Sequence, residues 1–248
     1  KDDVRSWHVI GEAMRLAYAD RETYLGDPDF VTVPIAGLID PAYLKGRSKL
    51  IALDKALARH EPGAPPGAPP RTPALPRPES GTSHFVAIDR DGDIAAWTST
   101  IESFFGSQLI ANGVILNNEL TDFSFTPEKD GAPVANRVEP GKRPLSSMSP
   151  TIVYDAKGTP VFTVGAAGGK TIIMQVVKAI IAHFDWGLSA QESIAMGLEY
   201  FDKDGLVLEQ GTALEAMKAP LEAIGHHVTI NRLGLKANAA ERAADGRW

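Results

Sequence analysis

The chain has 248 residues, 44% of them hydrophobic, which is enough to form one large core or two small ones. Its formal net charge of −6 argues against a nucleic-acid partner, because phosphates require a basic surface. It contains no cysteine, which excludes disulfides, thiolate metal ligands and cysteine nucleophiles. No apolar run is long enough to span a membrane, and no targeting signal can be read, so a periplasmic and a cytoplasmic location both stay open.

Residues 1–61 are predicted to be largely helical. Apolar residues near helical spacing favour a helix over residues 4–19. The Asp40-Pro41 pair, with proline at a first helical position, predicts a second helix that runs to about residue 60. Residues 62–78 contain eight prolines, a composition typical of an extended, solvated connector. We therefore divide this part of the chain into a helical unit, residues 1–61, and a proline-rich linker, residues 62–81.

Beyond the linker the hydrophobic period changes from helical to strand-like. Strands are predicted over residues 82–88 and 94–100, on either side of a turn at Asp91-Gly92. Further strands are expected at residues 114–117, 149–154, 160–164 and 228–230, and helices at residues 170–184, from Ser189 on, and at residues 213–223. Because strands come first and helices follow, residues 82–248 are predicted to form a layered α+β unit.

A hydroxyl residue, Thr82, lies at the junction between the linker and the first predicted strand. The hydroxyl of a threonine is a weak nucleophile unless a base lies beside it, and a threonine at a chain start can use its own α-amine. Cleavage between Gly81 and Thr82 would therefore create that base. Gly81 has no Cβ, which lets the Thr82 hydroxyl approach the preceding carbonyl. From these two residues alone, an ordinary turn before a strand is the commoner explanation.

Polar or glycine-rich clusters at other strand ends are further candidates for a site. They are Thr100 with Glu102, Glu119 with Asp122, Ser146 with Ser147, and Gly168 with Gly169. The Gly-Gly pair precedes a predicted helix, so its backbone N–H groups lie at a positive helix end that suits an oxyanion. Taken singly, each cluster is also explained by a turn or a helix cap.

Two other kinds of site fit the sequence less well. The stretch that ends in Gly169-Lys170-Thr171 resembles a phosphate-binding loop, but Val164 stands where that motif has a glycine, so nucleotide binding remains only an alternative. The six histidines show no metal-ligand spacing, and the sequence predicts neither a metal nor a cofactor.

The order of these clusters along the chain, and the residues in each, resemble those of the γ-glutamyltransferase family. The resemblance rests on the strings TSH at 82–84, TIE at 100–102, LNNELTDFS at 116–124, KRPLSSMSPT at 142–151 and GAAGG at 165–169, and on AYADR with LGDPDF in residues 17–30. It covers essentially the whole chain. It implies an N-terminal-nucleophile (Ntn) hydrolase αββα sandwich that cuts itself into two subunits. Residues 1–61 would end the large subunit, residues 62–81 would lead to the cut, and residues 82–248 would form most of the small catalytic subunit.

The resemblance implies a role for the residues around the cut. Thr82 would be the nucleophile and the new N-terminus, and Thr100 would hydrogen-bond to its hydroxyl or amine. Gly168 and Gly169 would supply oxyanion N–H groups. The implied reaction moves the γ-glutamyl group of glutathione or a related amide to Thr82, and then to water, an amino acid or a peptide.

The resemblance also implies how the donor is recognised. Ser146 and Ser147 would hold its α-carboxylate, and Asp122 its α-ammonium. Glu102 and Glu119 stand where many members of the family carry asparagine and glutamine. Three carboxylates around one ammonium favour a donor that keeps its α-amine over a glutaryl amide.

Two alternatives remain open, a cephalosporin- or glutaryl-acylase-type amidase of the same fold and an unprocessed, inactive homologue that only binds. The family's large subunit extends upstream of Lys1, and that missing part is an expected partner. It supplies an arginine for the donor carboxylate, and we identify no counterpart of this arginine in the sequence.

Overall fold

The computed structural model describes residues 1–74 and 81–248, so the end of the predicted linker, residues 75–80, lies outside the described residues. The first long element is helix α1, Val4–Tyr24. The side chain of Asp3 accepts a hydrogen bond from the backbone N–H of Arg5 and caps its start. This confirms the predicted first helix, which continues five residues beyond the predicted end at residue 19.

The predicted second helix is wrong beyond its first two turns. Helix α2 is Ile35–Leu38 and helix α3 is Pro41–Ser48, with Asp40 as its N-cap. The chain then leaves the helix, because its backbone donors bond to other parts of the protein. The N–H of Ala56 donates to the carbonyl of Ile224 at 2.8 Å, and the N–H of Leu57 donates to the Glu12 carboxylate at 3.2 Å.

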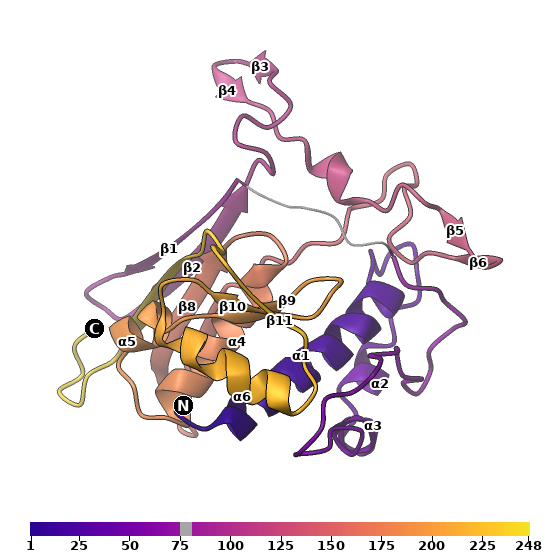
Figure 1. Ribbon diagram of the computed structural model, residues 1–248. Coiled ribbons are helices and arrows are strands. Elements are labelled where there is room, and N and C mark those ends of the chain that lie inside the picture. The colour runs from indigo at the N-terminus through magenta and orange to yellow at the C-terminus, as the bar shows by residue number, and fades with distance from the viewer. Residues whose placement is uncertain (75–80) are drawn as a thin grey trace.

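Two sheets packed on each other, with helices against one of them, form one part of the body of the protein (Figure 1). Strands β1, Thr82–Ile88, and β2, Ile94–Thr100, pair antiparallel with the predicted bounds. A second antiparallel sheet has the order β12-β8-β7, with β7 at Thr151–Tyr154, β8 at Pro160–Ala167 and β12 at Lys236–Glu241. Strand β1 packs on β8 and β12. Helices α4, Thr171–Phe184, and α5, Ala190–Ala195, also contact this sheet, α4 on β8 and α5 on β12.

Strand β8 runs three residues beyond the predicted end at Val164, because residues 165–167 pair with β12. The break in the chain therefore falls at Gly168 and Gly169, whose φ angles of 129° and 58° favour glycine. Gly165 is required for another reason. A Cβ there would lie 2.2 Å from the imidazole ring of His84, so the glycine lets the two sheets approach each other.

A third sheet, of order β11-β10-β9, packs near α1. Its strands are β9, Glu199–Phe201, β10, Leu206–Glu209, and β11, Val228–Asn231. The predicted helix over 213–223 is divided into a 3₁₀ turn, Ala213–Met217, and helix α6, Lys218–Ala223. Pro220 has no N–H to donate to the preceding turn, which explains why the helix restarts near it. The core between these elements and α1 is made by Trp7, Leu206, Leu208, Leu214, Leu221 and Val228.

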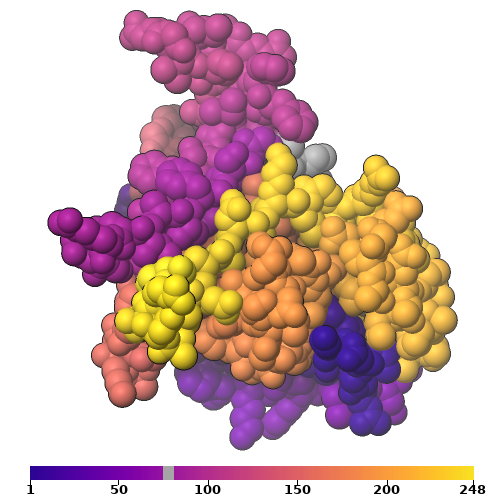
Figure 2. Space-filling view, turned by 90° about the vertical axis from the view of Figure 1, so that its left-hand side faces the viewer, coloured from indigo at the N-terminus to yellow at the C-terminus, as the bar shows by residue number. Residues whose placement is uncertain are grey.

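The segment between β2 and β7 projects from the body (Figures 1 and 2). It contains the short pairs β3, Ile110–Ala111, with β4, Val114–Ile115, and β5, Glu128–Lys129, with β6, Ala132–Pro133. Between them lies a 3₁₀ turn, Glu119–Asp122. The strand predicted at residues 114–117 is thus only two residues long. The turn carries two of the predicted site residues back to the body.

Candidate active site

Thr82 begins β1, and the register places it opposite Thr100, the last residue of β2. Side chains alternate along the strand, so Thr82 and His84 face the second sheet and are buried. On the outer face Phe85 and Trp97 stack on each other and remain exposed. The Thr82 hydroxyl donates to Thr100 Oγ1 at 3.2 Å. Strand pairing therefore fixes the predicted nucleophile against its predicted hydroxyl partner.

The backbone on either side of these two threonines is tightly constrained. Gly81 has a φ of 89°, and a Cβ on it would lie 2.1 Å from the carbonyl oxygen of Glu102. Glu102 itself has a φ of 67°, and its N–H donates to Thr100 Oγ1 at 2.9 Å. A side chain at position 81 would thus displace the peptide bond before Thr82.

A small pocket gathers most of the predicted site residues. It is lined by Thr82, Thr100, Glu102, Glu119, Asp122, Ser146, Ser147, Met148 and Ile172. Gly168 and Gly169 are not among these residues. They lie at the junction of β8 and α4, one turn before Ile172, so the helix end that they open borders the pocket.

The acidic wall of the pocket comes from two segments. Glu102 is buried and accepts hydrogen bonds from Ser103 Oγ, at 2.6 Å, and from Asn118 Nδ2. Glu119 Oε1 is buried and has no hydrogen-bond partner among the residues that the structure describes. The backbone carbonyl of Asp122 accepts from Asn136. A buried, unpartnered carboxylate oxygen favours a cationic partner, since leaving such an atom unpaired is costly.

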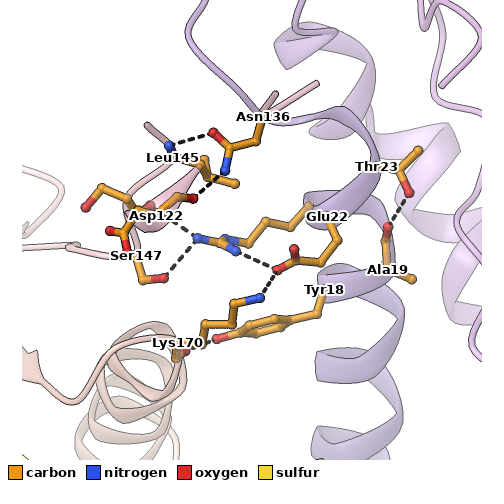
Figure 3. A network of polar contacts seen from close by, with 11 residues as sticks. Tyr18, Ala19, Glu22, Thr23, Asp122, Asn136, Leu145, Ser147 and Lys170 are labelled. Atoms are coloured by element: carbon orange, nitrogen blue, oxygen red, sulfur yellow. Dashed lines mark hydrogen bonds and ion pairs between the residues drawn. The ribbon is translucent and has the colours of Figure 1, made fainter. Parts of the chain in front are cut away.

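The serine wall is held from two sides (Figure 3). Asn136 donates to the Asp122 carbonyl at 2.7 Å and accepts from the Leu145 N–H at 3.0 Å, so it joins the acidic and serine segments. From α1, Arg21 Nη2 donates to Ser147 Oγ at 2.9 Å and to the Ser146 carbonyl at 3.3 Å. Sequence reasoning missed Arg21. It lies within the AYADR string, but no spacing signal connects it to serines 125 and 126 residues away.

An ion pair anchors the serine segment to the loop after α1. Arg143 donates through Nε and Nη2 to the two carboxylate oxygens of Asp27, at 3.0 and 2.6 Å. Its backbone N–H also donates to Asp27 Oδ2, at 2.9 Å. These hydrogen bonds hold the pKa of the Asp27 carboxyl well below its usual range. The KRPLSS string is thereby tied to the LGDPDF string that follows α1.

Two titratable residues on the buried face of α1, His8 and Glu12, meet a third from far along the chain, His226. His8 Nε2 donates to the carbonyl of Ala52 at 2.6 Å, since a carbonyl can only accept, and His8 Nδ1 then accepts from His226 Nε2 at 2.7 Å. His226 Nδ1 faces Glu12 Oε1 at 3.7 Å, and burial lowers the pKa of His226 to about 4. One ligand atom from each residue lies within 4.8 Å of the others, a grouping that sequence spacing did not show. Both nitrogens of His8 are already engaged, and none of the three residues lines the pocket around Thr82.

Comparison with known proteins identifies the family. The family model described as Gamma-glutamyltranspeptidase matches residues 1–246. The chain belongs to this family. It is 43% identical over 205 residues to the glutathione hydrolase proenzyme of Bacillus subtilis, an alignment that covers 77% of the chain and 34% of that protein. It is also 32% identical over 224 residues to the acylase ACY 1 proenzyme of a Pseudomonas species, covering 89% of the chain and 37% of that protein.

Solved structures of γ-glutamyltranspeptidases and acylases share the fold. The T380A mutant of the Helicobacter pylori γ-glutamyltranspeptidase matches with a TM-score of 0.58 and 30% identity, over 66% of this chain and 93% of that one. The cephalosporin acylase of Bacillus halodurans matches with a TM-score of 0.79 and 22% identity, over 99% of this chain and 42% of that one. The α+β, Ntn-hydrolase fold predicted for this chain is therefore confirmed. The chain spans about a third of the length of the curated relatives that it matches.

No helix within residues 1–74 or 81–248 is long and apolar enough to cross a membrane.

Proposed function

We propose that the protein carrying this chain is a self-processing γ-glutamyl acyltransferase or hydrolase that acts on glutathione-like amides through Thr82. The arrangement of one pocket carries the proposal. Thr82 directly follows Gly81, a position where a side chain would clash with the backbone of Glu102. The Thr82 hydroxyl donates a hydrogen bond to Thr100 and shares the pocket with three carboxylates and two serines. The relatives' names, glutathione hydrolase proenzyme and γ-glutamyltranspeptidase, support the same reaction.

The proposed reaction starts with a cut between Gly81 and Thr82. One water is consumed as the Gly81–Thr82 C–N bond breaks, so Gly81 ends in a carboxylate and the Thr82 amide becomes an α-amine, which can take the proton from Oγ1. Oγ1 then attacks the γ-carbonyl carbon of the donor, and the negative charge forms on the carbonyl oxygen, for which Gly168 and Gly169 supply N–H donors. The amine passes its proton to the leaving nitrogen as the C–N bond breaks. Water, or the amine of an amino acid or peptide, then attacks the Thr82 ester and gives its proton to the α-amine. It takes the γ-glutamyl group, and the proton passes to Oγ1 as the C–O bond breaks, which restores the Thr82 hydroxyl.

Donor recognition uses the two polar walls of the pocket. Ser146 and Ser147 bind the α-carboxylate, and Asp122 with Glu102 and Glu119 surrounds the α-ammonium. The unpartnered Glu119 Oε1 supports this assignment, because a buried carboxylate oxygen is stabilised by a cation. The proposal follows the predicted division of the chain, with residues 1–61 ending the large subunit, residues 62–81 leading to the cut and residues 82–248 in the small one. No cofactor enters any step.

The main alternative function is that of an acylase that prefers glutaryl amides, and the similarity to acylase ACY 1 supports this alternative. The two functions differ in the α-amine of the donor. With three carboxylates at the pocket, we expect the purified protein to turn over a γ-glutamyl anilide about 10- to 100-fold more efficiently than the glutaryl anilide, the range that a hydrogen-bonded charge contributes. A preference for the glutaryl anilide would contradict the proposal. Absence of both turnover and cutting would favour a homologue that only binds.

A further inference from the structure

A largely buried chain of ionic contacts links α1 to two separate parts of the proposed site. Arg21 reaches Ser147 and Ser146, and its Nη1 donates to Glu22 Oε1 at 2.7 Å. The same carboxylate oxygen accepts from Lys170 Nζ at 3.0 Å. Lys170 directly follows Gly169, and its carbonyl accepts a hydrogen bond from the hydroxyl of Tyr18 (Figure 3). Neighbouring residues of one helix thus contact both the serines and the Gly-Gly turn.

These contacts are shielded from water. The side chains of Arg21, Glu22 and Lys170 are 9%, 15% and 16% exposed. Ion pairs at such low exposure are screened less than surface pairs, and an arginine fork keeps its geometry better than a lysine does. Arg21 and Lys170 both donate to the Glu22 carboxylate, so these three side chains together carry a net charge of about +1 beside Ser147. The protein therefore maintains a positive charge behind the serines proposed to bind a carboxylate.

The bond to Ser147 has a fixed direction. A guanidinium only donates, so Ser147 Oγ accepts from Arg21 and uses its own hydrogen as a donor elsewhere. That polarity suits a serine that donates to a bound carboxylate. Loss of Arg21 would release this orientation and remove the positive charge together.

Resting on the proposed function, we propose that Arg21 is a positioning residue for the α-carboxylate of the acyl donor, and that Glu22 and Lys170 couple this subsite to the Gly168-Gly169 turn. The role of Arg21 depends on the carboxylate. The role of Lys170, through the turn, is common to every acyl donor. The two residues should therefore respond differently when the carboxylate is removed from the donor.

Two anilides that differ only in this group test the proposal. A γ-glutamyl anilide carries the α-carboxylate, whereas a 4-aminobutyryl anilide lacks it but keeps the amine. For Arg21→Gln we expect kcat/KM for the γ-glutamyl anilide to fall about 10- to 100-fold, mainly through KM, since a charge-assisted hydrogen bond is lost. For the 4-aminobutyryl anilide, read by turnover and by competition against the γ-glutamyl anilide, we expect a change below about threefold, since its binding uses no carboxylate contact.

Three further variants make the result decisive. Arg21→Lys keeps the charge but cannot bond Ser147 and Glu22 with one planar group, so it should lie between the wild type and Arg21→Gln. Lys170→Gln should lower kcat for both anilides to a similar degree, and this comparison stands even if Arg21→Gln does not fold. Arg5→Gln, on the exposed start of the same helix, is the matched control and should behave like the wild type.

Each outcome decides the proposal. Selective loss on the γ-glutamyl anilide supports a role in carboxylate positioning. Equal losses on both anilides in Arg21→Gln and Arg21→Lys would show a purely structural role and overturn this inference while leaving the proposed function intact. A wild-type protein that turns over no γ-glutamyl anilide would remove the proposed function, and this inference with it.

Discussion

Replacement of Gly81 by alanine tests whether the backbone before Thr82 is built for cleavage. Two effects act at this position. A φ of 89° costs an L-residue about 1–2 kcal/mol, because its Cβ crowds the backbone. The Cβ would also lie 2.1 Å from the carbonyl oxygen of Glu102 and 2.8 Å from its carbon, where ordinary contacts begin near 3.4 Å. The chain must therefore move by about 1 Å at the bond to be cut.

A shift of this size should slow cutting strongly. Misplacement of reacting groups by about 1 Å costs roughly 100-fold in rate, so Gly81→Ala should cut about 100-fold more slowly than the wild type. The assay follows the uncut chain on a denaturing gel after purification, with intact mass to locate the cut. Thermal unfolding of each variant shows whether the fold is kept.

Gly92, in the hairpin turn between β1 and β2, provides a matched control. Its φ of 88° is nearly the same, but a Cβ there would meet nothing within 4 Å. Gly92→Ala therefore carries the backbone strain without the clash and should cut at the wild-type rate. Equal cutting rates in Gly81→Ala and Gly92→Ala would refute the idea that close packing around Gly81 prepares the bond.

Two further predictions concern a hydroxyl in the pocket and a buried lysine. Thr100→Val removes the acceptor of the Thr82 hydroxyl and should lower kcat for a γ-glutamyl anilide up to about tenfold, with Thr100→Ser nearly unaffected; equal kcat in both variants would contradict this. Burial lowers the pKa of Lys178 from 10.5 to about 8, so the unfolded chain binds more protons between these pH values. The free energy of unfolding should therefore rise with pH across this window, by up to about 3 kcal/mol, in urea titrations. Lys178→Met should lose this rise, and an unchanged pH profile would contradict the assignment.

Local signals predicted β1 and β2 well. Alternating side chains and the Asp91-Gly92 turn determine this hairpin without help from the rest of the chain. Strand β12 was missed because its residues, KANAAE, have little intrinsic strand preference and pair only because β8 lies beside them. The long second helix was predicted from its start signals, but contacts with Glu12 and Ile224 draw residues 56 and 57 away from it. Tertiary contacts decided both cases.

The candidate site was predictable for a different reason. Its residues stand at the ends of strands and turns, and the resemblance to γ-glutamyltransferases implied that Thr82, Glu119 and Ser147 share one site, as the pocket now places them. Contacts made by long side chains were not predictable. Arg21 and Ser147 are 126 residues apart in the sequence, and no local pattern predicts that their side chains meet. The oxyanion role of Gly168 and Gly169 stays a prediction, because the turn borders the pocket without lining it.

The most direct test of the account is N-terminal sequencing and intact mass of the purified protein in the form that turns over a γ-glutamyl anilide. We predict a chain that begins Thr-Ser-His-Phe, and we predict that Thr82→Ala yields neither this chain nor turnover. Turnover by a chain that stays joined between Gly81 and Thr82, or by Thr82→Ala, would contradict the central claim that the cut creates the catalytic base.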